Sequence, residues 1–141
     1  MKKSRVFIDS NIWFSAFYKK GVCSELLSYL HKTSWEMVIC ELVLEEIVRN
    51  IKEKIPQALA LVIEYFNSVK PTVAKNPLKY EIPAYKGLAS IHDLPILISA
   101  IDYKCAYFIT GNTKDFRSSR IKERFGLQIM APSDFKKLLK I

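Results

Sequence analysis

The chain has 141 residues, of which 50% are hydrophobic and 26% charged, so it has the size and composition of one folded domain rather than of a disordered segment. No apolar run approaches the roughly 18 residues that would span a bilayer, and the basic N-terminus reaches Asp9 too early to form a secretory signal. A net charge of +8 makes nucleic acid a candidate partner, although a lysine-rich proteome would produce the same excess.

Short apolar runs that predict buried strands alternate along the chain with longer segments of helical spacing. The strands are predicted at residues 5–8, 37–40, 106–110 and 127–130. Helical spacing covers residues 23–31, 44–55, 57–66, 94–101 and 135–139, with a break at Pro56. Residues 67–92 contain three prolines and predict a connection with one short strand at 72–74. This alternation predicts an α/β domain over residues 1–141, with a parallel sheet covered on both faces.

The cysteines and the basic residues do not identify a functional site by themselves. The three cysteines are odd in number and widely spaced, which argues against a disulfide framework and against a zinc site and favours a reduced, cytoplasmic protein. Part of the positive charge lies in two clusters. One contains Lys2, Lys3 and Arg5, and the other contains Arg117, Arg120, Lys122 and Arg124.

Acidic residues lie just beyond the predicted strands, where functional groups of open α/β sheets collect. Asp9 directly follows the first strand, and Asp93 precedes a helix that has Pro95 in its first turn. The other candidates are Glu45 and Glu46, in the helix after residues 37–40, and Asn112 and Asp115, after residues 106–110. Four separate segments are therefore expected to bring carboxylates to one edge of the sheet.

Each of these acids also has a purely structural interpretation. Asp9 and Asp93 could be helix N-caps, Glu45 and Glu46 could be first-turn acids that complement the helix dipole, and Asp115 could be a turn residue. Their convergence favours a functional site instead. Clustered carboxylates repel one another unless a cation neutralises them, and their hard oxygen atoms suit Mg²⁺ or Mn²⁺.

Other chemistries of parallel sheets lack their motifs in this sequence. Neither GxGxxG nor GxxxxGK[ST] occurs, which argues against dinucleotide and P-loop sites, and the absence of GxSxG argues against a Ser-dependent hydrolase. A phosphoacceptor domain would need a second acidic pair near the first strand and a late Lys, and neither is apparent. Metal-dependent hydrolysis of phosphodiesters remains, and it agrees with the positive charge.

Four stretches, in order from about residue 5 to the end of the chain, resemble the motifs of the PIN-domain family. VFIDSNIWFSAF resembles its opening strand, which ends in Asp, a small residue and Asn, and CELVLEEIVRNI resembles its helix with one important Glu. HDLPILISAIDYKCAYFITGNTKDF resembles the third and fourth motifs, and GLQIMAPSDFKKLL the last strand and helix. Residues 67–92 carry none of the family's motifs.

The resemblance implies a three-layer α/β/α PIN-like fold with a central, mainly parallel twisted sheet and an Mg²⁺- or Mn²⁺-dependent endoribonuclease site. Many such proteins are toxins of VapC-type toxin–antitoxin pairs and are inhibited by a cognate antitoxin. An alternative is a weakly active or inactive PIN-like module that binds RNA or a protein.

Matching the motifs residue by residue makes Asp9 the first acid, Asn11 its supporting amide and Asp93 the third acid. Helical periodicity does not choose between Glu45 and Glu46 for the second acid, and the family pattern of Glu followed by an aliphatic residue favours Glu46. Many members have Asp directly after Thr-Gly, where this chain has Asn112. Others have Asn there and Asp three residues later, before Phe, which makes Asp115 the expected fourth metal ligand.

Two further surfaces are expected to bind partners. Trp13 and Tyr18 could stack on unpaired RNA bases while Lys19 and Lys20 bind phosphates, although a helix packed on the sheet would show the same pattern. The predicted helix at residues 57–66 has more apolar surface than one side of a core needs. It could form a homodimer or bind an antitoxin segment, and a fully buried helix would have the same pattern.

Overall fold

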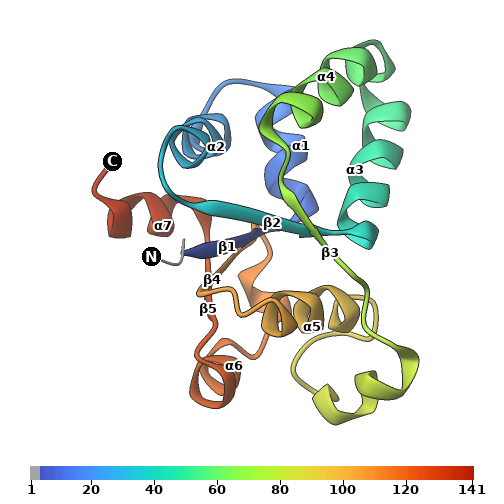
Figure 1. The fold of residues 1–141 in the computed structure, drawn as a ribbon, viewed down its shortest axis with the longest axis vertical. Helices are drawn as coiled ribbons and strands as arrows, with labels where there is room; N and C mark the ends of the chain where they lie inside the picture. Colours follow the sequence, from blue (N-terminus) through green and yellow to red (C-terminus); the bar gives the residue numbers. More distant parts are fainter. Residues whose placement is uncertain (1–3) are drawn as a thin grey trace.

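The computed structural model describes residues 4–141, so Lys2 and Lys3 lie outside the described residues. In the described part, five strands form one sheet in the order β3-β2-β1-β4-β5, and every neighbouring pair is parallel (Figure 1). Phe7 at the centre of the sheet lies opposite Val38 on one side and Phe108 on the other. The strands are β1 (Arg5–Ile8), β2 (Glu36–Cys40), β3 (Thr72–Ala74), β4 (Tyr107–Ile109) and β5 (Gln128–Met130).

Helices cover both faces of this sheet. In Figure 1, α1 to α4 lie on one side of the strands and α5 and α6 on the other, which gives three layers. Helix α7 packs beside α2. The helices are α1 (Ser10–Tyr18), α2 (Val22–Lys32), α3 (Glu41–Lys54), α4 (Leu59–Val69), α5 (Leu94–Asp102), α6 (Ser118–Phe125) and α7 (Pro132–Leu139), with 3₁₀ turns η1 (Pro56–Ala58), η2 (Lys79–Tyr85) and η3 (Thr113–Asp115). The predicted α/β architecture is confirmed.

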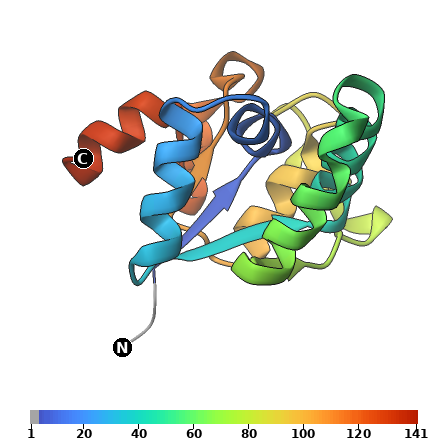
Figure 2. The same ribbon diagram turned by 90° about the horizontal axis from the view of Figure 1, so that it is seen from above.

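The strand order places a topological switch beside β1. The chain proceeds from β1 to β2 and β3 on one side of the sheet, and then crosses to β4 and β5 on the other side. Ligands of open α/β sheets bind in the crevice that opens at such a switch, outside the carboxyl ends of the strands. In Figure 2 the arrowhead of β1 points toward the start of α1, and this junction is where Asp9 lies.

Side chains from both faces of the sheet form the core. The rings of Phe7 and Phe108 stack with centroids 5.0 Å apart across β1 and β4. Trp13 on α1 is completely buried, and its indole Nε1 donates a hydrogen bond to the carbonyl oxygen of Ile8 (3.1 Å). Trp13 is therefore a core residue that fixes α1 on the end of β1, and the prediction that it stacks on RNA bases is wrong.

Most predicted elements agree with the observed ones, and the differences have local causes. The strands at residues 5–8 and 72–74 have the predicted bounds. Helix α6 was not predicted because Ile121 is its only buried residue, so its sequence lacks an apolar stripe. Helix α3 begins at Glu41, which makes Glu41 the first-turn acid and excludes that explanation for Glu45 and Glu46. Within residues 4–141, no helix is both long and apolar enough to cross a bilayer.

Candidate active site

Asp9 is the buried centre of the candidate site. It follows β1 with extended backbone angles and is the N-cap of α1, and one of its carboxylate oxygens accepts a hydrogen bond from the backbone N–H of Ser10 (2.8 Å). The other oxygen accepts from the hydroxyl of Thr110 (2.9 Å) and from the amide of Asn11 (3.3 Å). Only 8% of Asp9 is exposed, and its backbone N–H donates to Ile109 (3.0 Å). The carboxylate is thus held by groups from the first turn of α1 and from the residue that follows β4.

Asn11 and Thr110 connect the start of α1 to the end of β4. Besides contacting Asp9, the Asn11 amide donates to the Thr110 hydroxyl (3.3 Å) and its Oδ1 accepts from the backbone N–H of Gly111 (2.9 Å). A Cβ atom at position 111 would lie 3.3 Å from that oxygen, so glycine permits this close approach. The supporting position predicted for Asn11 agrees with these contacts. Thr110 was not predicted, although a hydroxyl residue ends the strand.

Glu46, and not Glu45, faces the start of α1. The hydroxyl of Ser10 donates a short hydrogen bond to Oε2 of Glu46 (2.6 Å). Glu46 is half-buried in the second turn of α3, whereas Glu45 is exposed. Because α1 and α3 pack together, the two helices bring Ser10 and Glu46 into contact although they are far apart in sequence.

Asp93 approaches from the opposite layer, immediately before α5. Its carboxylate makes no capping hydrogen bond to that helix, so the predicted helix-cap interpretation of this acid does not hold. The carboxylate instead accepts a hydrogen bond from the hydroxyl of Ser90 (2.9 Å). The carbonyl oxygen of Ser90 also accepts from the backbone N–H groups of Asp93 (3.0 Å) and Leu94 (2.9 Å), so Ser90 fixes both the turn and the acid. Ser90 was not predicted either.

The electrostatics of Asp9 show that these acids share one environment. Burial raises the pKa of Asp9 from 3.8 to about 6, the hydrogen bonds from Thr110 and Ser10 oppose this rise, and the negative charges of Glu46 and Asp93 add to it. The charges of two carboxylates from two other segments therefore reach Asp9 at the switch in the sheet. The charge of Asp115 does not contribute to the pKa of Asp9.

Asp115 and Asn112 lie in the turn that follows β4. Both are exposed, and Asp115 ends η3 in a cleft that also contains Lys114 and Arg117. The backbone N–H of Asn112 donates to the Thr110 hydroxyl (3.1 Å), so the turn is tied to the site through its backbone. The structure thus brings together Asp9, Glu46 and Asp93 but does not bring Asp115 to Asp9. A metal-binding role for Asp115 stays a prediction.

The three carboxylates are chemically suitable ligands for a hard divalent cation, but in this structure they are too far apart to surround one. Carboxylate oxygens that repel one another are the ligands that Mg²⁺ and Mn²⁺ prefer. Among residues 4–141, however, no three Asp, Glu, His or Cys side chains stand close enough together to form a closed metal site. Asp9 is fixed by its hydrogen bonds, so Glu46 and Asp93 would have to move toward it to surround an ion.

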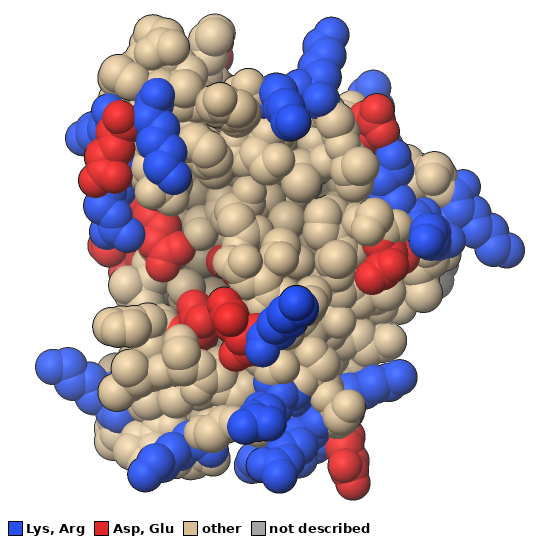
Figure 3. Space-filling model, turned by 180° about the vertical axis from the view of Figure 1, so that it is seen from behind, with Lys and Arg blue, Asp and Glu red and all other residues tan. Residues whose placement is uncertain are grey.

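In Figure 2, β1 points toward the top of the picture, which is the back of the molecule in Figure 1. Figure 3 shows the molecule from that side, so the carboxyl ends of the strands face the viewer there. Acidic side chains gather there around a hollow, and Lys and Arg side chains surround them (Figure 3). This surface therefore combines a negative centre with a positive rim, an arrangement suited to a polyanion held beside bound cations.

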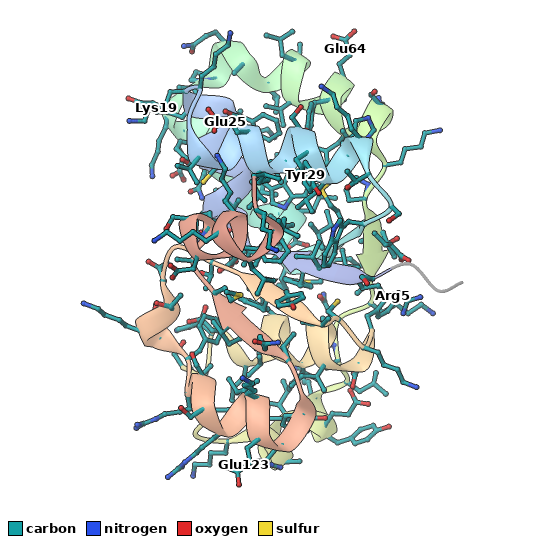
Figure 4. All side chains as sticks on the ribbon, turned by 90° about the vertical axis from the view of Figure 1, so that its left-hand side faces the viewer. Arg5, Lys19, Glu25, Tyr29, Glu64 and Glu123 are labelled. Atoms are coloured by element: carbon teal, nitrogen blue, oxygen red, sulfur yellow. The ribbon has the colours of Figure 1, made fainter. Side chains whose placement is uncertain are left out.

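The residues predicted to bind RNA beyond Asp9 lie at the far end of α1. Tyr18, Lys19 and Lys20 are exposed, and Figure 4 shows Lys19 at the edge of the molecule. A helix of nine residues separates them from Asp9 by roughly 14 Å along its axis. Their role in RNA binding stays a prediction.

Comparisons with other proteins identify the fold. No protein-family model matches the sequence, and a search of curated proteins finds no match. Several solved structures are similar, including the following two. One is VapBC2 from Rickettsia felis bound to a DNA fragment from the promoter (18% identity, 90% of this chain and 98% of that chain, TM-score 0.62). The other is DNA-bound VapBC from Salmonella typhimurium (18% identity, 92% of this chain and 98% of that chain, TM-score 0.61). At this identity the similarity is one of fold.

Proposed function

We propose that this chain is a PIN-type, Mg²⁺- or Mn²⁺-dependent endoribonuclease that acts as the toxin of a VapBC-like toxin–antitoxin pair. The observation that carries the proposal is the meeting of Asp9, Glu46 and Asp93 at the switch in the sheet. The net charge of +8 and the fold shared with the VapBC structures support it.

In this proposal Asp9, Glu46 and Asp93 would hold the cation, which when bound supplies a Lewis acid to the scissile phosphate and lowers the pKa of an attacking water. The chain's own residues position the three acids before a cation binds, and Glu46 and Asp93 would then move toward Asp9 to surround it. Thr110, Asn11 and the backbone of Ser10 keep the Asp9 carboxylate in one orientation, and the Ser10 hydroxyl orients Glu46. Ser90 does the same for Asp93.

An apolar cleft lies on the helical layer formed by α1, α2 and α4. It has a volume of about 390 Å³ between α1, α2 and α4, and Phe17, Leu27 and Val62 contribute apolar surface to it. Leu61 at its edge is 69% exposed and extends the apolar surface of the cleft, and contiguous exposed apolar surface marks protein-binding sites. We propose that an apolar segment of the antitoxin binds in this cleft. A homodimer through α4 stays the alternative, and gel filtration of the isolated chain distinguishes the two.

A second candidate function is that of a PIN-like module that binds RNA or a protein with little or no catalysis. The position of Asp115 favours this candidate, because the site then contains three acids and no closed arrangement of metal ligands. Both candidates predict RNA binding, and only the first predicts cleavage.

The deciding experiment is RNA cleavage by the purified chain with Mn²⁺, with Mg²⁺ and with EDTA. The nuclease proposal predicts metal-dependent cleavage that Asp9→Asn and Asp93→Asn abolish and that Glu46→Gln strongly reduces. Glu45→Gln is the matched control, because it removes the same charge from the neighbouring exposed residue. Cleavage that survives in Asp9→Asn would have to come from another site or a contaminant, and no cleavage by the wild type would leave the binding module.

A further inference from the structure

A polar cleft adjoins Asp93 and belongs to none of the roles assigned above. It has a volume of about 580 Å³, and residues of two loops line it, one before α5 and one around η3. Ser90, whose hydroxyl holds the Asp93 carboxylate, lines this cleft together with Lys114 and Arg117. The cleft is therefore the immediate neighbour of one of the three acids.

The two loops that form the cleft are fixed in place. Ala89 and Phe116 form an antiparallel bridge, and the backbone N–H of Arg117 donates to the carbonyl oxygen of Leu88 (2.8 Å). Leu88 and Phe116 are buried on either side of this junction, and the Phe116 ring packs against Phe108 in the core (centroids 5.0 Å apart). The cleft exists before any ligand arrives, which lowers the entropic penalty of binding.

Its charges favour an anion. Lys114 and Arg117 are exposed, and within residues 4–141 neither forms an ion pair. Asp115 also lines the cleft, so its ionic side chains carry a net charge of +1. The positive surface continues along α6, where Arg120, Lys122 and Arg124 are exposed while Ile121 faces the core. Lys and Arg side chains dominate this lower part of the face in Figure 3, and the single acid Glu123 points outward from α6 in Figure 4.

We infer that this cleft is a subsite for the RNA backbone, in which Lys114 and Arg117 bind phosphates beside the one that is cleaved. The inference rests on the proposed ribonuclease function and adds the path of the substrate. In this arrangement the RNA strand runs from the three acids along the cleft beside Ser90 and then over the basic surface of α6. Arg117 can form two parallel hydrogen bonds to a phosphate, and Lys114 supplies a compact charge. Both residues act in binding and positioning the substrate.

The test measures binding of a short fluorescent oligouridylate by anisotropy, in EDTA so that no cleavage occurs, over a series of salt concentrations. The double variant Lys114→Gln and Arg117→Gln should lower affinity on the order of tenfold at low salt and reduce the logarithmic salt slope by about 1.4, since each single-strand phosphate contact contributes about 0.7. The backbone bond from Arg117 to Leu88 is retained, and thermal melting verifies that the variant is folded.

The matched control is the double variant Lys32→Gln and Lys104→Gln. It removes the same charge from two exposed lysines, one at the end of α2 and one in the connection from α5 to β4, both near the amino ends of strands and therefore at the opposite edge of the sheet. A smaller change in this control supports the subsite, and equal changes in the two double variants would overturn it. The outcome is separate from the proposed activity. If the wild type does not cleave RNA but the cleft variant alone loses binding, the cleft is retained and the nuclease proposal fails.

Discussion

The hydroxyl of Thr110 donates a hydrogen bond to the carboxylate of Asp9 at 2.9 Å, across 101 positions of sequence. Thr110 follows β4 and Asp9 follows β1, which are neighbouring parallel strands. The bond therefore crosses the switch in the sheet at the point where the candidate site opens. It holds the most buried acid of the site in a fixed orientation and lowers its pKa against the effect of burial.

Thr110→Val should destabilise the folded chain by about 1–3 kcal/mol, because it leaves the buried Asp9 carboxylate without its hydroxyl donor while preserving the shape of the side chain. Thr110→Ser keeps the hydroxyl donor and should lose less of the free energy of unfolding than Thr110→Val. Urea unfolding at pH 7 in EDTA measures both variants. A larger loss of stability for Ser than for Val would mean that the methyl group, and not the hydrogen bond, is what matters at this position.

Stability of the metal-free chain should depend on pH through Asp9. Its pKa is about 6 in the folded state and 3.8 when unperturbed, so between these values the folded state keeps a proton that the unfolded state has released. This contribution is complete below about pH 4 and is lost as the pH rises through 6. It amounts to about 3 kcal/mol at most.

Asp9→Asn lacks this titration, so the difference in unfolding free energy between the wild type and Asp9→Asn should change across that range. Acids that lie far from Asp9 titrate alike in both proteins and cancel in the difference. At pH 7 in EDTA the variant should be at least as stable as the wild type, because it removes one charge from a repulsive cluster. Parallel stability curves from pH 4 to 7 would contradict the assigned environment of Asp9.

Whether Asp115 binds the metal determines whether the site has three acidic ligands or four. From its place in the cleft with Lys114 and Arg117, we expect Asp115→Asn to bind Mn²⁺ like the wild type and to bind RNA more tightly in EDTA. Asn112→Asp should tighten Mn²⁺ binding, and it should lower stability without metal through added repulsion. Calorimetric titration of Mn²⁺ into each variant measures this. Weaker Mn²⁺ binding by Asp115→Asn than by the wild type would instead make Asp115 the fourth metal ligand that its motif predicts.

Lys19 and Lys20 were predicted to bind phosphates. They lie at the far end of α1 from Asp9, so this role requires RNA to extend along the whole helix. If RNA reaches the far end of α1, the double variant Lys19→Gln and Lys20→Gln should flatten the logarithmic salt slope of RNA binding by about 1.4 and weaken binding of all sequences alike. Anisotropy with several oligonucleotides measures both effects. An unchanged slope would assign these lysines to ordinary solvated surface.

The sheet and the place of its acids could be predicted because buried parallel strands are short apolar runs, and the residue after such a run must lie at the carboxyl edge. The orientation of individual side chains could not. Trp13 lies four residues after Asp9, and whether its ring faces the core or a substrate depends on how α1 packs against α3 and α4. Periodicity left Glu45 and Glu46 equivalent, and their difference comes from the contact with Ser10.

The roles of Ser90 and Thr110 depend on contacts that no local pattern encodes. Both are hydroxyl residues in connecting segments, where serine and threonine are common for other reasons. The direction of a loop six residues beyond a strand is likewise not set by spacing. The structure places Asp115 in the cleft beside Ser90, and its predicted role as a metal ligand next to Asp9 stays a prediction.

The central claim is that Asp9, Glu46 and Asp93 form one cation site, and the most direct test is the shift in melting temperature that Mn²⁺ produces. Binding to the folded state alone raises stability in proportion to the logarithm of free Mn²⁺ above its Kd. We expect a clear rise for the wild type and for Glu45→Gln, and a much smaller rise for Asp9→Asn, Glu46→Gln and Asp93→Asn. Equal Mn²⁺ shifts in all five proteins would contradict the claim.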